Sequence, residues 1–179
     1  PCCGSTGCLG TMLPKPESCR PCVLWQDGRG FVEDEIRDDA LVQIHAQGPG
    51  AEEERQGKPK VGPTGKLEEE RFFPLAGLTR EKVSLSNTLR CRWIDEHGKR
   101  TDKLPPPKVL KEAATYCQRT YFRVGASTKL IVAQGDPAWQ SLGGSPPITA
   151  WRGYLKQWPA LDVAVTSPGL PSFRVLAMV

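Results

Sequence analysis

Short apolar runs that end at turn residues recur along the chain and predict its strands. "LVQIH" (residues 41–45) stops before a Gly–Pro–Gly turn, and "KVSLSN" (82–87) alternates between apolar and polar positions. "KLIVAQG" (129–135) again ends at glycine, and "FRVLAMV" (173–179) is the last apolar run. Runs of this length bounded by turn signals are typical of strands buried in a parallel sheet.

Stretches with helical patterns separate these runs. Apolar residues recur among charges over residues 67–76, which predicts an amphipathic helix ending near Gly77. A Pro-rich segment leads into a second helix, from about Pro107 to about Arg123, and "PAWQSLGG" (137–144) starts a short third one with a glycine stop. Residues 47–65 are punctuated by glycines and predict a loop.

Strands that alternate with helices predict an α/β fold. We expect a three-layer sandwich with a central, mostly parallel four-stranded sheet flanked by helices. Ligands bind at the carboxyl ends of the strands in open parallel sheets. Attention therefore falls on Gln47–Gly50 and Asn87–Arg92, which follow the first two predicted strands.

Composition fits a single globular domain. The 179 residues are 39% hydrophobic and 25% charged, and no run reaches the roughly 18–20 apolar residues of a membrane span. Neither a membrane span nor a signal peptide is predicted. Residues 1–18 are rich in Gly, Pro and Cys and predict an irregular arm, so the domain is expected over residues 19–179. The net charge of +4 permits a nucleic-acid partner without requiring one.

Seven cysteines cannot all pair within one chain, and without a secretory signal metal ligation or free thiols are favoured. Cys19, Cys22, Cys91 and Cys117 stand in or beside predicted elements, so that a four-thiolate site can form once the chain folds. By spacing alone, zinc and a cubane iron–sulfur cluster are equally admissible. Alternatively, the last two cysteines are simply small buried residues.

Four strings occur in a fixed order: "CRPCVLWQDGRGFV", "AQGPGAEEERQGKPKVGPTG", "AGLTREKVSLSNTLRCR" and "AATYC". Together they resemble the iron–sulfur uracil-DNA glycosylases, family 4 of the uracil glycosylase superfamily, and their phage-type relatives. The resemblance runs from Cys19 to about Gly153. It implies that a structural [4Fe–4S] cluster is held by Cys19, Cys22, Cys91 and Cys117, whereas Cys2, Cys3 and Cys8 have no counterpart.

The same resemblance implies the site residues. Gln47, Gly48, Pro49 and Gly50 occupy the first motif, with Gln47 where the family usually has Glu. A glutamine cannot act as a general base, although it can orient water or hold a uracil carbonyl. Asn87 falls where the family reads the edge of uracil, and Glu53 matches an acidic residue that orders the loop.

Two departures from the family pattern affect the expected pocket. Lys60 stands where the family places an aromatic ring that stacks on the flipped base, and Phe31 is a candidate to replace that ring. The family's C-terminal His-Pro loop is absent, and we expect the chain to be truncated before it. His45 is expected to be structural, and Asp136, in "QGDPAW", is expected to cap a helix rather than act in catalysis.

The resemblance predicts a uracil-DNA glycosylase, a hydrolase of base excision repair that cleaves the N-glycosidic bond of deoxyuridine in single- or double-stranded DNA. The alternatives are a catalytically impaired glycosylase-fold module that binds DNA or a polymerase, and an unrelated four-cysteine zinc protein. We expect a monomer in the cytoplasm of a bacterial or phage-infected cell, with replication or repair proteins as possible partners. Five basic residues flank the strand ends and either contact DNA phosphates or are solvated: Lys58, Lys60, Lys66, Arg90 and Arg92.

Overall fold

A five-stranded sheet forms the centre of the protein. The computed structural model describes residues 12–145, 147–153, 155–157 and 174–178. The strands stand in the order β2-β1-β5-β7-β6, with the first four parallel and β6 antiparallel to β7. Their bounds are β1 Val42–Ala46, β2 Val83–Asn87, β5 Leu130–Gln134, β6 Leu155–Gln157 and β7 Arg174–Met178.

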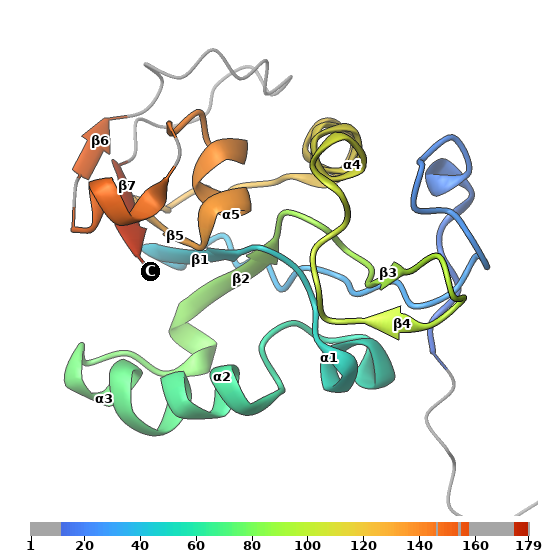
Figure 1. The fold of residues 1–179 in the computed structure, drawn as a ribbon. Helices are drawn as coiled ribbons and strands as arrows, with labels where there is room; N and C mark the ends of the chain where they lie inside the picture. Colours follow the sequence, from blue (N-terminus) through green and yellow to red (C-terminus); the bar gives the residue numbers. More distant parts are fainter. Residues whose placement is uncertain (1–11, 146, 154, 158–173, 179) are drawn as a thin grey trace, which may run out of the picture.

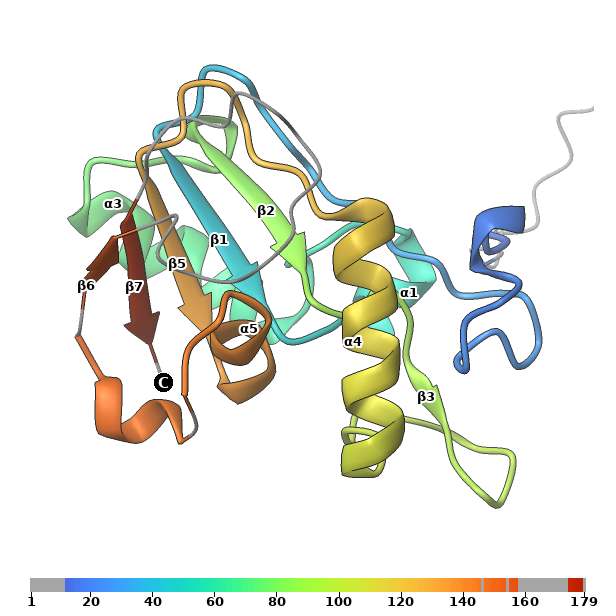
Figure 2. The same cartoon turned by 90° about the horizontal axis from the view of Figure 1, so that it is seen from above.

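Helices cover both faces of this sheet (Figure 1). On one side lie α2 (Pro63–Leu67), a π-helical turn (Glu68–Phe72) and α3 (Phe73–Leu75), whereas α4 (Pro107–Tyr121) and α5 (Asp136–Ser141) lie on the other. Helix α1 (Ala51–Gln56) follows the carboxyl end of β1, and 3-10 turns occur at Glu17–Cys19, Arg80–Lys82 and Ile148–Trp151. Strands β3 (Trp93–Ile94) and β4 (Arg100–Thr101) form a small antiparallel hairpin (Figure 1). Figure 2 shows β3 away from the main sheet, beyond α4.

The core packs against both faces of the central strands. On one face Phe122, Ile131 and Trp139 form a buried cluster, and on the other Phe73 packs with Leu85. All five residues of β2 are buried, which a strand covered on both faces requires. The register places Ala46 between Asn87 and Gln134, so the carboxyl ends of β2, β1 and β5 lie side by side.

The mostly parallel α/β arrangement is confirmed, but the prediction of four strands was wrong because β6 adds a fifth, antiparallel one. The loop predicted for residues 47–65 was also wrong, since it contains α1 and the beginning of α2. Helix α1 begins where the Glu53 carboxylate accepts the backbone N–H of Gly50, and it ends at Gly57, which has a left-handed φ of 68°. None of the helices within the described residues combines the length and apolar character that crossing a bilayer requires.

Candidate active site

A cleft of about 730 Å³ opens at the carboxyl ends of the parallel strands. Its walls come from the turn after β1, the start of α1, the loop before α2 and the ends of β2 and β5. Seven of the residues that the sequence singled out for catalysis or substrate binding line this one cleft: Gln47, Gly48, Pro49, Gly50, Glu53, Lys60 and Asn87. The folded chain therefore brings together positions as far apart in the sequence as Gln47 and Asn87, which are separated by 40 positions.

A second hollow, of about 470 Å³, lies between the N-terminal segment and α4. Pro21, Cys22 and Lys111 are among its lining residues, and none of the residues predicted for catalysis or substrate binding lies there. The cleft at the strand ends is therefore the candidate active site, because open parallel sheets bind their ligands there.

The Glu53 carboxylate fixes the two loops that form the mouth of the cleft. Its Oε2 accepts the backbone N–H of Gly50 at 3.1 Å, and its Oε1 accepts those of Val61 at 3.0 Å and Gly62 at 2.7 Å. A carboxylate that accepts several backbone N–H groups holds them more firmly than a neutral acceptor would. The turn after β1 and the loop that carries Lys60 are thereby tied to one side chain.

Asn87 lines the cleft and has a buried polar side chain. The residue is 3% exposed, and its backbone N–H donates to Asp34 Oδ1 at 3.2 Å. Its side-chain Nδ2 has no hydrogen-bond partner among the described residues. A buried donor left unpaired costs about 1–3 kcal/mol, so this amide is suited to a ligand that supplies the missing acceptor.

Lys60 also lines the cleft and lies in a buried polar network. Its ammonium donates to Glu68 Oε1 at 2.9 Å and also to Gln134 Oε1, while Gln134 Nε2 donates to Glu68 Oε1 at 2.9 Å. Lys60 has a left-handed φ of 55°, unusual for a residue with a side chain.

The expectation that Phe31 replaces the family's ring was wrong, because Phe31 packs edge-on against Tyr121 and does not line the cleft.

Gln134 and Gly135 are site residues that the sequence did not single out, although both line the cleft. The signal was present, because Gln134 ends a parallel strand in the same way as Asn87 does. At Gly135, with a φ of 86°, an added Cβ would lie 2.9 Å from the Gln47 carboxamide oxygen. Glycine at this position therefore allows the Gln47 side chain to lie over the end of β5.

His45 is buried behind the cleft, as a structural histidine would be. Its Nδ1 lies 2.8 Å from Ser86 Oγ, and its Nε2 lies 3.1 Å from Ser141 Oγ and 3.2 Å from Thr88 Oγ1. Burial, and to a smaller extent the charge of Arg90, lowers the pKa of His45 to about 3. The imidazole is thus neutral at ordinary pH.

Asp136 is the first residue of α5, and Gly135 occupies the N-cap position. The Asp136 Oδ1 atom accepts the backbone N–H of Ile148 at 2.5 Å, so Asp136 anchors the 3-10 turn that begins at Ile148. The prediction that Asp136 caps the helix was therefore wrong.

The two arginines expected beside the strand ends serve internal contacts. Arg90 is 3% exposed, pairs with Asp34 and donates to the Tyr121 carbonyl at 3.0 Å. Arg92 pairs with Glu54 at 3.1 Å and with Asp102 at 2.8 Å. Neither is the solvated or DNA-facing charge that the sequence suggested, whereas Lys58 and Lys66 are exposed.

All four cysteines of the predicted cluster are buried free thiols. The Cys22 and Cys117 thiols share a hydrogen bond, and Cys22 and Cys91 lie in one buried cluster with Leu24. Cys19 Sγ lies 2.9 Å from the Tyr121 hydroxyl. Burial, reinforced by its charge interactions with the Cys22 and Cys19 thiols, raises the pKa of Cys91 to about 11.

The spacing of these thiols bears on the kind of centre they fit. Within the described part of the chain, no three His, Cys, Asp or Glu side chains are placed to hold one metal ion between them. Zn–S bonds of about 2.3 Å would put tetrahedral sulfur ligands about 4 Å apart. A cubane cluster binds each cysteine at a separate iron and accepts four thiolates that stand further apart. Four cysteine thiolates are a donor set that both a zinc ion and a four-iron cluster accept.

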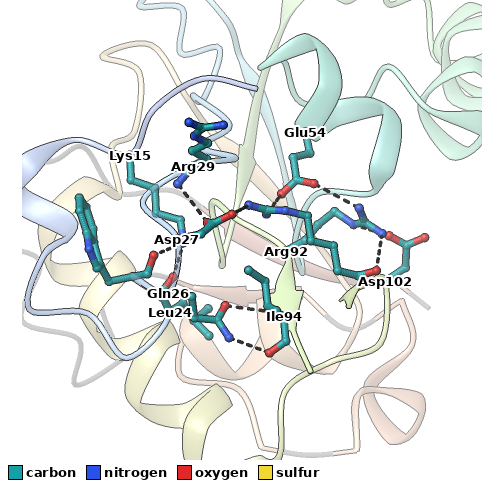
Figure 3. A network of polar contacts seen from close by, with 11 residues as sticks. Lys15, Leu24, Gln26, Asp27, Arg29, Glu54, Arg92, Ile94 and Asp102 are labelled. Atoms are coloured by element: carbon teal, nitrogen blue, oxygen red, sulfur yellow. Dashed lines mark hydrogen bonds and ion pairs between the residues drawn. The ribbon is translucent and has the colours of Figure 1, made fainter. Parts of the chain in front are cut away.

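A polar network joins the cysteine-bearing N-terminal segment to α1 and the β3–β4 hairpin (Figure 3). Glu54, which is 2% exposed, accepts hydrogen bonds from both Arg92 and Arg100, and Arg100 also pairs with Asp27. Lys15 is buried and donates to the Leu24 and Trp25 carbonyls, the latter at 3.0 Å. The end of the predicted arm is thus packed against the domain, while residues 1–11, with Cys2, Cys3 and Cys8, lie outside the described part.

These features define an α/β protein with a ligand cleft at the carboxyl edge of a parallel sheet and a buried group of four cysteines beside it. Residues 33–173, most of the chain, match the family described as the uracil DNA glycosylase superfamily. The chain therefore belongs to the uracil DNA glycosylase superfamily.

Several curated proteins named type-4 uracil-DNA glycosylase are similar to the chain. The protein from Sulfurisphaera tokodaii is 35% identical over 87 residues, which is 49% of this chain and 40% of that protein. The protein from Saccharolobus solfataricus is 35% identical over 96 residues, 54% and 44% of the two chains. The protein from Archaeoglobus fulgidus is 30% identical over 102 residues, 57% and 48%. The matched region thus spans less than half the length of each of these relatives.

Proposed function

We propose that the chain is the catalytic domain of a uracil-DNA glycosylase that hydrolyses the N-glycosidic bond of deoxyuridine in DNA. The observation that carries this proposal is the meeting of the Gln47–Gly50 turn and the unpartnered Asn87 amide in one cleft at the strand ends. Membership of the superfamily and the names of the similar proteins support the same reaction.

Base excision requires the nucleotide to leave the duplex and enter a pocket that reads its edge. The Asn87 amide offers both a donor and an acceptor, which match a carbonyl and the N–H of uracil. Its backbone is held by Asp34, so the amide is oriented before the base arrives. Asn87 would therefore select uracil and donate to an oxygen on which negative charge develops as the base leaves.

Gln47 would hold the attacking water. Its carboxamide oxygen can accept a hydrogen bond from a water, and its N–H can donate one to a water oxygen. The carboxamide cannot, however, remove a proton from the water. The bond to the sugar therefore breaks largely by stabilisation of charge, with oxocarbenium character at the sugar and an anionic leaving base. Gly48 and Gly50 let the turn approach the nucleotide closely, because neither carries a side chain.

We also propose that Cys19, Cys22, Cys91 and Cys117 hold a [4Fe–4S] cluster. Their burial as free thiols from three separate segments, and the interactions among the Cys22, Cys91 and Cys117 thiols, support this assignment. Bound there, the cluster would supply a rigid cross-link between the N-terminal segment, the loop after β2 and α4. The purified protein should be brown and contain about four irons per chain by metal analysis; one zinc and no iron would refute the assignment.

The catalytically impaired DNA-binding or polymerase-associated module remains the second candidate function. It is favoured by one observation, the Lys60 side chain held in an ion pair on the wall of the cleft. Incubation of the full chain with a uracil-containing oligonucleotide, followed by alkali, separates the two. Strand cleavage at the uracil position supports the glycosylase, and tight binding without cleavage supports the module.

The remaining proposals follow from the same family assignment. We propose that the enzyme acts as a monomer on single- or double-stranded uracil-containing DNA, in the cytoplasm of a bacterial or phage-infected cell, with replication or repair proteins as further partners. Light scattering after size exclusion tests the monomer, and parallel assays on single- and double-stranded oligonucleotides test the substrate.

A further inference from the structure

A buried ion pair lies beside the cleft. Lys60 and Gln134 line the cleft, whereas Glu68 is not among the lining residues. The side chains of Lys60 and Glu68 are 10% and 6% exposed. Because the Lys60 ammonium donates to Gln134 Oε1, it lies within hydrogen-bond reach of a residue that lines the cleft.

The loop holds this ammonium in place through several fixed contacts. Arg80 donates to the Lys60 carbonyl at 3.0 Å and to the Pro59 carbonyl at 2.7 Å. Gly65 allows close approach from the other side, since an added Cβ would lie 2.0 Å from the Lys60 carbonyl oxygen. A left-handed conformation that the surrounding structure enforces is characteristic of functional positions.

The ammonium also keeps donor capacity for a ligand. A lysine carries three N–H donors, and two of them have partners among the described residues, namely Glu68 and Gln134. Gln134 is itself fixed, because its Nε2 donates to Glu68 at 2.9 Å. The third N–H has no hydrogen-bond partner among the described residues, and Lys60 lines the same cleft as Asn87, whose Nδ2 is also without a partner there.

From these observations we propose that Lys60, positioned by Glu68 and Gln134, stabilises the negative charge of the departing base. The inference rests on the proposed glycosylase function and adds a charge-stabilising group to it. When the N-glycosidic bond breaks, its electron pair stays on the base nitrogen and water adds to the sugar carbon. The water then loses one proton, and a proton taken up by the base anion gives neutral uracil. A fixed cation in a site shielded from water lowers the energy of that charge without reorganising as it forms.

The experiment compares single-turnover excision of uracil and of 5-fluorouracil from the same oligonucleotide by the full chain. The 5-fluorouracil anion is intrinsically more stable and needs less help from the protein. We expect Lys60→Met to slow uracil excision about 10- to 100-fold, below the roughly 10²–10³-fold typical of an oxyanion donor because Glu68 offsets part of the charge. The loss on 5-fluorouracil should be clearly smaller, and oligonucleotide affinity should change little.

Three further variants distinguish charge from folding. Lys60→Arg should restore most of the uracil rate, and Lys129→Met, at the exposed amino end of β5, should leave both rates unchanged. Because Lys60→Met leaves Glu68 buried without its partner, the double variant Lys60→Met/Glu68→Gln should regain stability while keeping the slow rate. Equal losses of rate on the two bases, or full activity of Lys60→Met, would overturn this inference but not the proposed glycosylase function. An inactive wild-type chain would overturn the proposed function and this inference with it.

Discussion

His45 gives the protein an acid sensitivity that can be calculated. The imidazole is fully buried and contacts the hydroxyls of Ser86, Thr88 and Ser141. Because burial lowers its pKa from 6.5 to about 3, the folded state excludes a proton that the unfolded state binds below pH 6.5. The stability that the neutral imidazole contributes is complete above that pH and is lost as the pH falls toward about 3.

The magnitude follows from the linkage between proton binding and folding. Between pH 7 and pH 5 the unfolded His45 takes up most of one proton and the folded one almost none. The integrated loss in the free energy of unfolding is about 2 kcal/mol, since each pKa unit corresponds to about 1.4 kcal/mol. His45→Gln should abolish this loss, although it should also lower stability at pH 7 by about 1–3 kcal/mol because buried hydroxyls lose their partners.

Urea unfolding at pH 7 and pH 5, followed by circular dichroism, tests this reasoning. The pH-dependent loss in the wild type should exceed that of His45→Gln by about 2 kcal/mol. His97→Gln is the matched control, because the His97 side chain is 81% exposed, and it should behave as the wild type. If wild type and His45→Gln lost equal stability between the two pH values, the neutral buried state of His45 would be disproved.

Four further predictions test the site and its supports. Asn87→Ala should reduce uracil excision at least about 10²-fold with unchanged circular dichroism, because a transition-state donor is lost; a near-normal single-turnover rate would contradict the assignment. Cys91→Ser should yield a colourless protein with a lowered iron content on metal analysis, whereas retention of all iron would exclude this thiol as a ligand. Glu53→Ala should lower the free energy of unfolding by about 2–4 kcal/mol, since three backbone N–H groups lose a charged acceptor. Gly65→Ala should cost about 1–3 kcal/mol in urea unfolding, because the new methyl group would strike the Lys60 carbonyl; wild-type stability would show that the loop relaxes freely.

The strands were predictable because each is a short apolar run that ends at a turn. For β2, however, the sequence pattern predicted the strand but not the burial of both its faces. Its alternation suggested one polar face, yet Ser84 and Ser86 are both fully buried. Ser84 Oγ accepts the backbone N–H of Arg37 at 3.0 Å, and Ser86 Oγ contacts His45. Such partners come from distant segments, so a local pattern cannot reveal that both faces are covered.

Helix α1 was not predicted from the sequence, for a different reason. Six residues are too few to show a helical period, and the signals that define it are a carboxylate returning to the Gly50 N–H and a left-handed Gly57. The positions of the candidate site residues followed from sequence motifs, but the surroundings of Lys60 did not. Its partners Glu68 and Gln134 lie 8 and 74 positions away, and only the folded chain brings them to one ammonium.

Helix α1 carries two neighbouring carboxylates that serve opposite neighbours. Glu53 gathers the backbone of the cleft mouth, and Glu54, one residue later, holds the arginines that reach toward the cysteine-bearing segment. One short helix thus supports both the loops around the cleft and the arginines that reach the cysteine-bearing segment. We therefore expect damage to the cysteine-bearing segment to loosen the loops of the cleft, although no cysteine is among the residues described as lining it.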